Sequence, residues 1–197
     1  MYILKIKFLL VLSFISFISN VSISTAQANS YLVVHNAGMV ILSSYYRAYF
    51  ERLGLIGSDG NFISKIEQMK AVNYLQYLVT ESENTEENLL LLNKILTGIP
   101  LKSPISQNFP ITEEEKQLAN SLIKSAISHW PAAGATEISG FRGNWLLRDG
   151  FLVETDTYWE LTVDRRAYDI LLNSSPFSFS IIKYPWMTKP LRVTWPH

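Results

Sequence analysis

The sequence of 197 residues contains no cysteine, which excludes disulfide bonds, thiol nucleophiles and thiolate metal sites. It has only three histidines, His35, His129 and His197, and no two of them have the i, i+4 spacing that places two metal ligands on one helix face. Lysine plus arginine and aspartate plus glutamate number 17 each, so no net charge attracts nucleic acid or an acidic membrane. We therefore expect no metal, no cofactor and no nucleic-acid partner.

Motifs that carry catalysis are also missing. The segment Gly54-Leu55-Ile56-Gly57 lacks the later glycine, or the Gly-Lys-Ser/Thr ending, that would cradle phosphates. No serine lies in a Gly-x-Ser-x-Gly turn, which would expose a nucleophile. The triplet Glu113-Glu114-Glu115 fits the first turn of a helix, where the helix dipole stabilises negative charge, better than paired catalytic carboxylates. No catalytic residue is predicted, and the chain does not resemble an enzyme.

The first 30 residues differ in composition from the rest of the chain. Lys5 and Lys7 precede an apolar stretch at 8–18, and Ala26-Gln27-Ala28 has the small-residue spacing that signal peptidase prefers. Serines interrupt the apolar stretch, so a stable membrane span, which needs about 20 mainly apolar residues, is not expected. The segment is interpreted as a signal-like leader, or as an artefactual start that replaces part of a longer gene.

The whole sequence is 48% hydrophobic, and residues 31–197 are long enough to bury the core of one medium domain. Helical spacing of apolar residues predicts four to five helices, at 37–53, 63–80, 85–98, 112–130 and 136–147. Thr85 is the expected cap of the third helix, and Thr112 with Glu115 forms a capping-box pattern. Four consecutive leucines predict that the third helix is buried nearly all round, with Leu90, Leu92 and Leu96 in the core.

After Gly150 the period of the apolar residues changes from helix to strand. Segments 151–154 and 158–164 predict a hairpin around Asp156-Thr157, and 179–183 and 191–195 predict two more strands. One helical turn is expected at 168–172. The predicted fold class is α+β, a helical N-terminal part followed by a small antiparallel β-sheet.

Two groups near the carboxyl end permit both structural and binding interpretations. Asp164, Arg165, Arg166 and Asp169 could form a fork for a carboxylate or phosphate, but a local ion-pair network is favoured. Large apolar side chains near prolines are typical of protein interfaces as well as of cores, so a second group is the candidate protein-interaction site. It consists of Tyr184, Trp186, Met187 and Trp195.

Ordered sequence blocks between residues 31 and 195 carry a family resemblance. They are Asn36-Ala37-Gly38, 50–55, 71–78, 92–100, His129-Trp130, 146–150, 159–163, 168–172, Pro185-Trp186-Met187 and Val193-Thr194-Trp195. This set resembles the contractile injection system tape-measure proteins, which help to set the length of phage-tail-like particles. Ser175-Pro176-Phe177 stands where the family pattern has Leu-Pro-Trp, which replaces one large apolar group by another.

The resemblance implies a non-enzymatic assembly role, with tube, cap or baseplate proteins of the particle as partners and assembly in the cytoplasm. In the family a longer, extended portion measures length, whereas even a fully helical 1–30 would reach only about 45 Å. The chain is therefore expected to be a fragment of a longer protein, an anchoring domain, or a relative with another use. The alternative, which rests on the leader, is a secreted or periplasmic protein-binding module.

Overall fold

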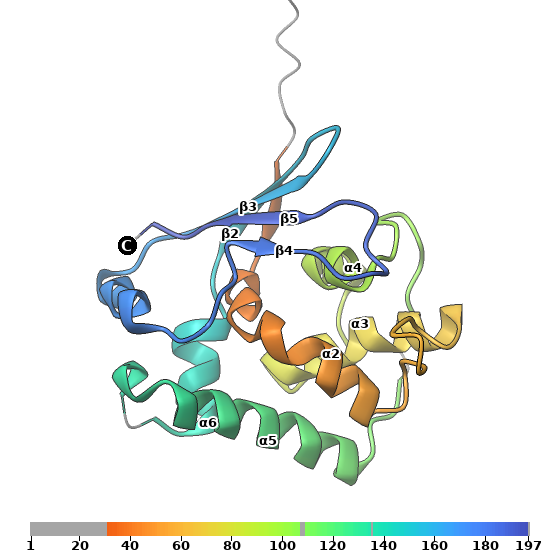
Figure 1. Cartoon of the computed structure of the whole chain (residues 1–197), viewed down its shortest axis with the longest axis horizontal. Coiled ribbons are helices and arrows are strands. Elements are labelled where there is room, and N and C mark those ends of the chain that lie inside the picture. Colours follow the sequence, from red (N-terminus) through yellow and green to blue (C-terminus); the bar gives the residue numbers. More distant parts are fainter. Residues whose placement is uncertain (1–30, 107–108, 135, 197) are drawn as a thin grey trace, which may run out of the picture.

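The computed structural model describes residues 31–106, 109–134 and 136–196. A sheet forms one side of the molecule and helices α5 and α6 form the opposite side, with α2, α3 and α4 between them (Figure 1). The leader at 1–30 lies outside the described residues. The helices are not confined to the N-terminal part, because a strand precedes them and helical turns lie between later strands.

The first predicted helix consists of two pieces. A 3-10 turn, η1 (Ala37–Leu42), is wholly buried and leads into α2 (Ser43–Arg52). Gly54, at φ 70°, follows the end of α2 in the left-handed region that glycine adopts without strain. Helix α3 (Lys65–Thr80) begins where the side chain of Ser64 accepts a hydrogen bond from the backbone of Ile66, and it ends at Glu81.

The leucine-rich helix starts later than predicted. Thr85 does not cap it, because the 3-10 turn η2 (Glu87–Leu90) comes first and α4 (Leu91–Thr97) continues from that turn. The burial of Leu90, Leu92 and Leu96 is confirmed, with exposed fractions of 2%, 0% and 0%. Leu89 is 39% exposed, so the helix is not buried all round. A 3-10 turn presents a different set of positions to the core from the α-helix that the sequence predicted.

The fourth predicted helix is α5 (Glu113–His129), and its capping box between Thr112 and Glu115 is confirmed. It packs against α2, α3 and α6. After the 3-10 turn η3 (Pro131–Ala133), the short helix α6 (Ile138–Phe141) continues into a π-helical turn, η4 (Arg142–Leu146). These short turns make the helical segments more numerous than predicted.

The sheet has five strands in the order β1-β2-β3-β5-β4. Their bounds are β1 (Leu32–Val34), β2 (Gly150–Glu154), β3 (Trp159–Val163), β4 (Ile181–Ile182) and β5 (Leu191–Thr194). The hairpin of β2 and β3 is confirmed, with Leu152 opposite Leu161 and both fully buried. Leu161 in turn lies opposite Val193 of β5, so the inner face of the sheet continues across three strands.

Two features of the sheet differ from the prediction. Strand β5 pairs parallel to β3, so the sheet is mostly but not wholly antiparallel. The chain between them passes through the 3-10 segment η5 (Ala167–Ser174) and β4, and returns to the start of β3 before β5 begins. Strand β1 was not predicted, since three residues are too short to show a strand period and the partner strand β2 lies far along the chain.

Within the described ranges, no helix combines the length and the apolar character needed to cross a membrane.

Candidate docking site

Three of the four predicted interaction residues lie together on the loop between β4 and β5. The indole N–H of Trp186 donates a hydrogen bond to the carbonyl of Leu96 at the end of α4, over 2.9 Å. Its ring stacks on Tyr184, with centroids 4.8 Å apart, and contacts Phe62 at the same separation. Met187 is buried and its sulfur accepts the backbone N–H of Tyr184. The loop is thus fastened to the helices.

Tyr184 fixes the same loop to a different helix. Its hydroxyl donates to the backbone carbonyl of Ser43 at the start of α2. Burial raises the pKa of Tyr184 well above its usual range, because ionising the phenol would place a charge away from water. The hydroxyl therefore stays a donor throughout the physiological pH range.

Gly98 allows this loop to approach α4 closely. The residue has a φ of 73°, and a Cβ added there would lie 2.1 Å from the backbone carbonyl oxygen of Trp186. No side chain fits such a distance, so only glycine satisfies both the backbone conformation and the contact. The sequence showed Gly98 as a helix end, but nothing in it indicated the contact with Trp186.

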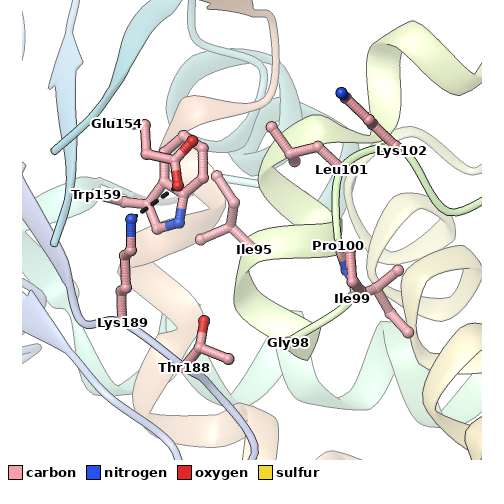
Figure 2. Close-up of a pocket in the computed structure, with 10 residues that line it drawn as sticks. All are labelled: Ile95, Gly98, Ile99, Pro100, Leu101, Lys102, Glu154, Trp159, Thr188 and Lys189. Carbon is pink, nitrogen blue, oxygen red and sulfur yellow. Dashed lines mark hydrogen bonds and ion pairs between the residues drawn. The ribbon is translucent and has the colours of Figure 1, made fainter. Parts of the chain in front are cut away.

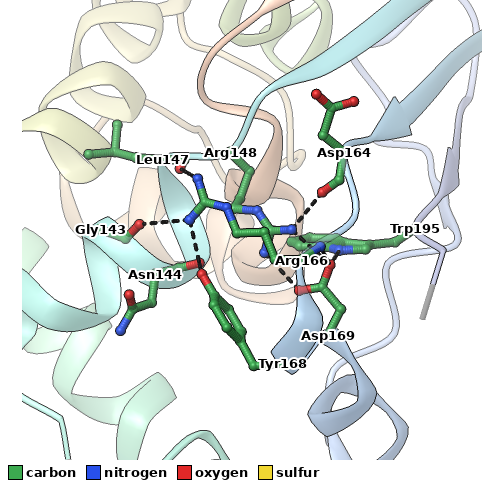
Figure 3. Close-up of polar contacts among 9 residues, drawn as sticks. All are labelled: Gly143, Asn144, Leu147, Arg148, Asp164, Arg166, Tyr168, Asp169 and Trp195. Carbon is green, nitrogen blue, oxygen red and sulfur yellow. Dashed lines mark hydrogen bonds and ion pairs between the residues drawn. The ribbon is translucent and has the colours of Figure 1, made fainter.

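Trp195, the fourth predicted residue, lies in a separate buried cluster (Figure 3). Arg148 and Asp169 are both fully buried and form a two-pronged ion pair, with Nη1 and Nη2 of the guanidinium each 2.8 Å from a carboxylate oxygen. The indole of Trp195 donates to the same carboxylate over 3.0 Å. Burial alone would raise the pKa of Asp169, but these hydrogen bonds, with one from the backbone of Arg166, hold the pKa below its usual value.

The prediction that residues 164–169 form ion pairs with one another is therefore wrong. Asp169 pairs with Arg148 from the preceding η4–β2 connection, and Asp164 contributes its backbone carbonyl to Arg148 instead of its carboxylate. The guanidinium of Arg166 donates to the hydroxyl of Tyr168 and to the carbonyl of Leu147. The cluster holds elements together. Both terminal nitrogens of Arg148 and of Arg166 have acceptors, whereas Nε of Arg148 is buried without one.

His129 and Trp130 lie at the end of α5 and have structural contacts. Trp130 is fully buried, and the ring of His129 lies 2.7 Å from the hydroxyl of Tyr45 on α2. In the parts of the chain that the structure describes, no group of three or more histidine, aspartate or glutamate side chains could hold a metal ion.

A pocket of about 410 Å³ opens beside the loop that carries Trp186 (Figure 2). One wall comes from the end of α4 and the segment after it, and the other from the β2–β3 hairpin and the segment before β5. The lining residues are Ile95, Gly98, Ile99, Pro100, Leu101, Lys102, Glu154, Trp159, Thr188 and Lys189. Its volume falls in the range of ligand-binding clefts.

Two of the charged side chains that line this pocket pair with each other. Lys189 forms an ion pair with Glu154 at 2.8 Å and also donates to the carbonyl of Thr155, so the one carboxylate of the lining is neutralised. The sequence does not indicate this pocket, because its lining comes from segments that are separate along the chain. The closest indication was Pro100, which stiffens one wall.

We expect Trp186→Ala to lower the free energy of unfolding by about 2 to 3 kcal/mol, less than for a fully buried tryptophan because Trp186 is half-buried. Trp186→Phe keeps a ring but loses the hydrogen bond to Leu96, so it should cost about 1 kcal/mol. Denaturant unfolding measures both values. A stable Trp186→Ala protein that no longer co-purifies with its partners would instead make Trp186 an interface residue, a role that stays a prediction.

Comparison with known proteins identifies the family. The family model described as contractile injection system tape measure protein matches residues 16–195, which is most of the chain. No curated protein and no solved structure matches the chain at a significant level.

Proposed function

Because the chain belongs to the contractile injection system tape measure protein family, we propose that its described part is a non-enzymatic docking domain of such a particle. Docking here means that the domain binds another protein component and so fixes one end of the measuring assembly. The observation that carries the proposal is a family match that coincides with a folded α+β domain instead of an extended rod.

Helix length supports docking over measuring for this part of the chain. Among the described residues the longest helix is α5, with 17 residues. At about 1.5 Å per residue it spans only about 26 Å. The described residues also fold back on themselves, since β1 pairs with β2 and β3 pairs with β5. Their contribution to length control therefore comes through contact with other proteins.

The pocket between α4 and the sheet is the surface that we assign to docking. Protein interfaces place a large side chain of one partner in an apolar pocket of the other, surrounded by polar groups. Ile95, Leu101 and Trp159 supply the apolar walls here, while Lys102 and Thr188 are exposed at the edge. The particle component would be a tube, cap or baseplate protein, bound in the cytoplasm during assembly.

Filling the pocket tests the proposal. Thr188→Trp places a large ring at the edge of the pocket, and Thr194→Trp places the same ring at an exposed position of β5 that does not line it. We expect only Thr188→Trp to abolish co-purification with particle proteins and to reduce the number of intact particles in electron micrographs. Both variants should keep their thermal midpoint within about 3 °C, or roughly 1 kcal/mol. Normal particles with a stable Thr188→Trp protein would refute docking at the pocket.

The leader supports a second candidate, a secreted or periplasmic protein-binding module. Cleavage after Ala28 would release it, yet the family match begins at residue 16, so cleavage would remove the first part of the matched region. Mass spectrometry of the mature N-terminus, with fractionation of the producing cells, separates the two candidates. A chain that starts at Asn29 and is recovered outside the cytoplasm would favour the module.

A further inference from the structure

We propose that the pocket binds an acidic peptide segment of the partner protein, with a large aliphatic side chain inside the pocket and the adjacent carboxylate at its edge. This inference rests on the proposed docking function and specifies the chemistry of the partner. It follows from the shape of the walls, from the charge of the lining, and from which polar groups near the pocket already have partners.

The walls select an aliphatic side chain. Ile95 and Leu101 come from the α4 side, while the indole of Trp159 closes the opposite side (Figure 2). Ile95 and Trp159 are only 5% and 9% exposed, and Leu101 is half-buried against the same core, so the pocket does not depend on mobile side chains. A branched aliphatic side chain would bury apolar surface against all three, at about 25 cal/mol per Å².

The charge of the lining selects a negative group. Its charged residues are Lys102, Lys189 and Glu154, and the last two neutralise each other in an ion pair. Lys102 is exposed and has no ion pair with any described residue. A carboxylate at the edge would therefore meet one uncompensated positive charge, in a position where part of the solvent is displaced.

Three backbone carbonyls around the pocket are already hydrogen-bonded within the protein. The carbonyl of Pro100 accepts the backbone N–H of Ser103, and the carbonyl of Leu101 accepts the ammonium of the buried Lys94. The carbonyl of Ile95 accepts the N–H of Gly98. These three carbonyls are therefore not the groups that a ligand would bind first.

Donors, by contrast, remain available. The indole N–H of Trp159 has no acceptor among the described residues and is not sealed from solvent. The hydroxyl of the exposed Thr188 and the ammonium of Lys102 complete the set. A peptide carboxylate and a peptide carbonyl are acceptors, so an acidic segment satisfies these donors, whereas a basic segment would oppose Lys102.

Nuclear magnetic resonance of the full chain tests this directly. The 15N-labelled protein is titrated with the peptide acetyl-Gly-Leu-Glu-Gly-amide, and the indole N–H signal of Trp159 is followed. Three matched peptides replace Leu by Ala, Glu by Gln, or Glu by Lys. We expect saturable shifts of the Trp159 signal with the Leu-Glu peptide, weaker binding by the Gln and Ala peptides, and the weakest by the Lys peptide.

Variants of the protein test whether Lys102 is the positive charge that binds the peptide carboxylate. Lys102→Gln should weaken binding of the Leu-Glu peptide about two- to fivefold, the range of exposed charge pairs, and remove its advantage over the Leu-Gln peptide. Lys124→Gln changes an exposed lysine on α5 that does not line the pocket, and should bind as the wild type does. Equal responses to the Glu and Lys peptides, or no response at Trp159, would overturn the acidic-segment inference. The docking proposal is tested separately. If the peptides do not bind as expected but Thr188→Trp still prevents particle assembly, docking at the pocket remains supported and only the acidic-segment inference is refuted.

Discussion

Replacing Arg148 by methionine should lower the free energy of unfolding by about 3 to 5 kcal/mol, because it leaves the carboxylate of Asp169 buried without its cation. Both side chains are fully buried, so water cannot replace the lost partner. Denaturant unfolding of the purified variant measures the loss. A decrease of less than about 1 kcal/mol would show that water reaches the pair in solution.

Two comparisons separate the buried charge from the change in side-chain volume. The double variant Arg148→Met with Asp169→Leu removes the orphan carboxylate and should recover part of the stability. Recovery should be incomplete, since the indole of Trp195 and the backbone N–H of Arg166 then lose their shared acceptor. Arg47→Ala breaks an exposed ion pair within α2 and should cost only about 0.3 to 0.5 kcal/mol.

The same carboxylate gives the stability a dependence on pH. The pKa of Asp169 is lower in the folded protein than in the unfolded chain, whose carboxyl pKa is about 3.9. Its contribution is therefore complete above the unfolded value and is lost as the pH falls through the folded value. We expect stability to decline below about pH 4, with a smaller slope in Asp169→Asn than in the wild type.

Truncating the leucines of α4 and the turn before it should also have large effects. Leu92→Ala and Leu96→Ala each remove a side chain with no exposed surface, and each should cost about 2 to 5 kcal/mol. Leu90→Ala, at 2% exposure, should fall in the same range. The cost is high because the surrounding core relaxes only partly around the new cavity.

Leu89 supplies the control for this series. It directly precedes Leu90 but is 39% exposed, so Leu89→Ala should change the free energy of unfolding by about 0.5 kcal/mol or less. Thermal or denaturant unfolding of all four variants gives the comparison. Equal losses at Leu89 and Leu92 would mean that the turn η2 does not place these two side chains as described.

Sequence signals within a few neighbouring residues determined much of the helical layer. The capping box at Thr112 and Glu115 and the glycine after α2 are each set by residues within a few positions, so the sequence predicted those ends correctly. The start at Thr85 was wrong, because the same residues can form a 3-10 turn or an α-helix and packing decides between them. The family, too, was recognisable from ordered sequence blocks.

Only the tertiary structure decided the contacts between distant segments. Residues 32–34 form strand β1 only because they pair with the distant strand β2. The parallel pairing of β5 with β3 depends on the path of the chain between them. Arg148 meets Asp169, and Gly98 meets Trp186, across separations that no local pattern reports. The pocket exists for the same reason, since α4 and the hairpin form its walls only after they pack. The spacing of apolar residues and helix capping depend on residues a few positions apart. Which distant segments come into contact depends on how the whole core is packed.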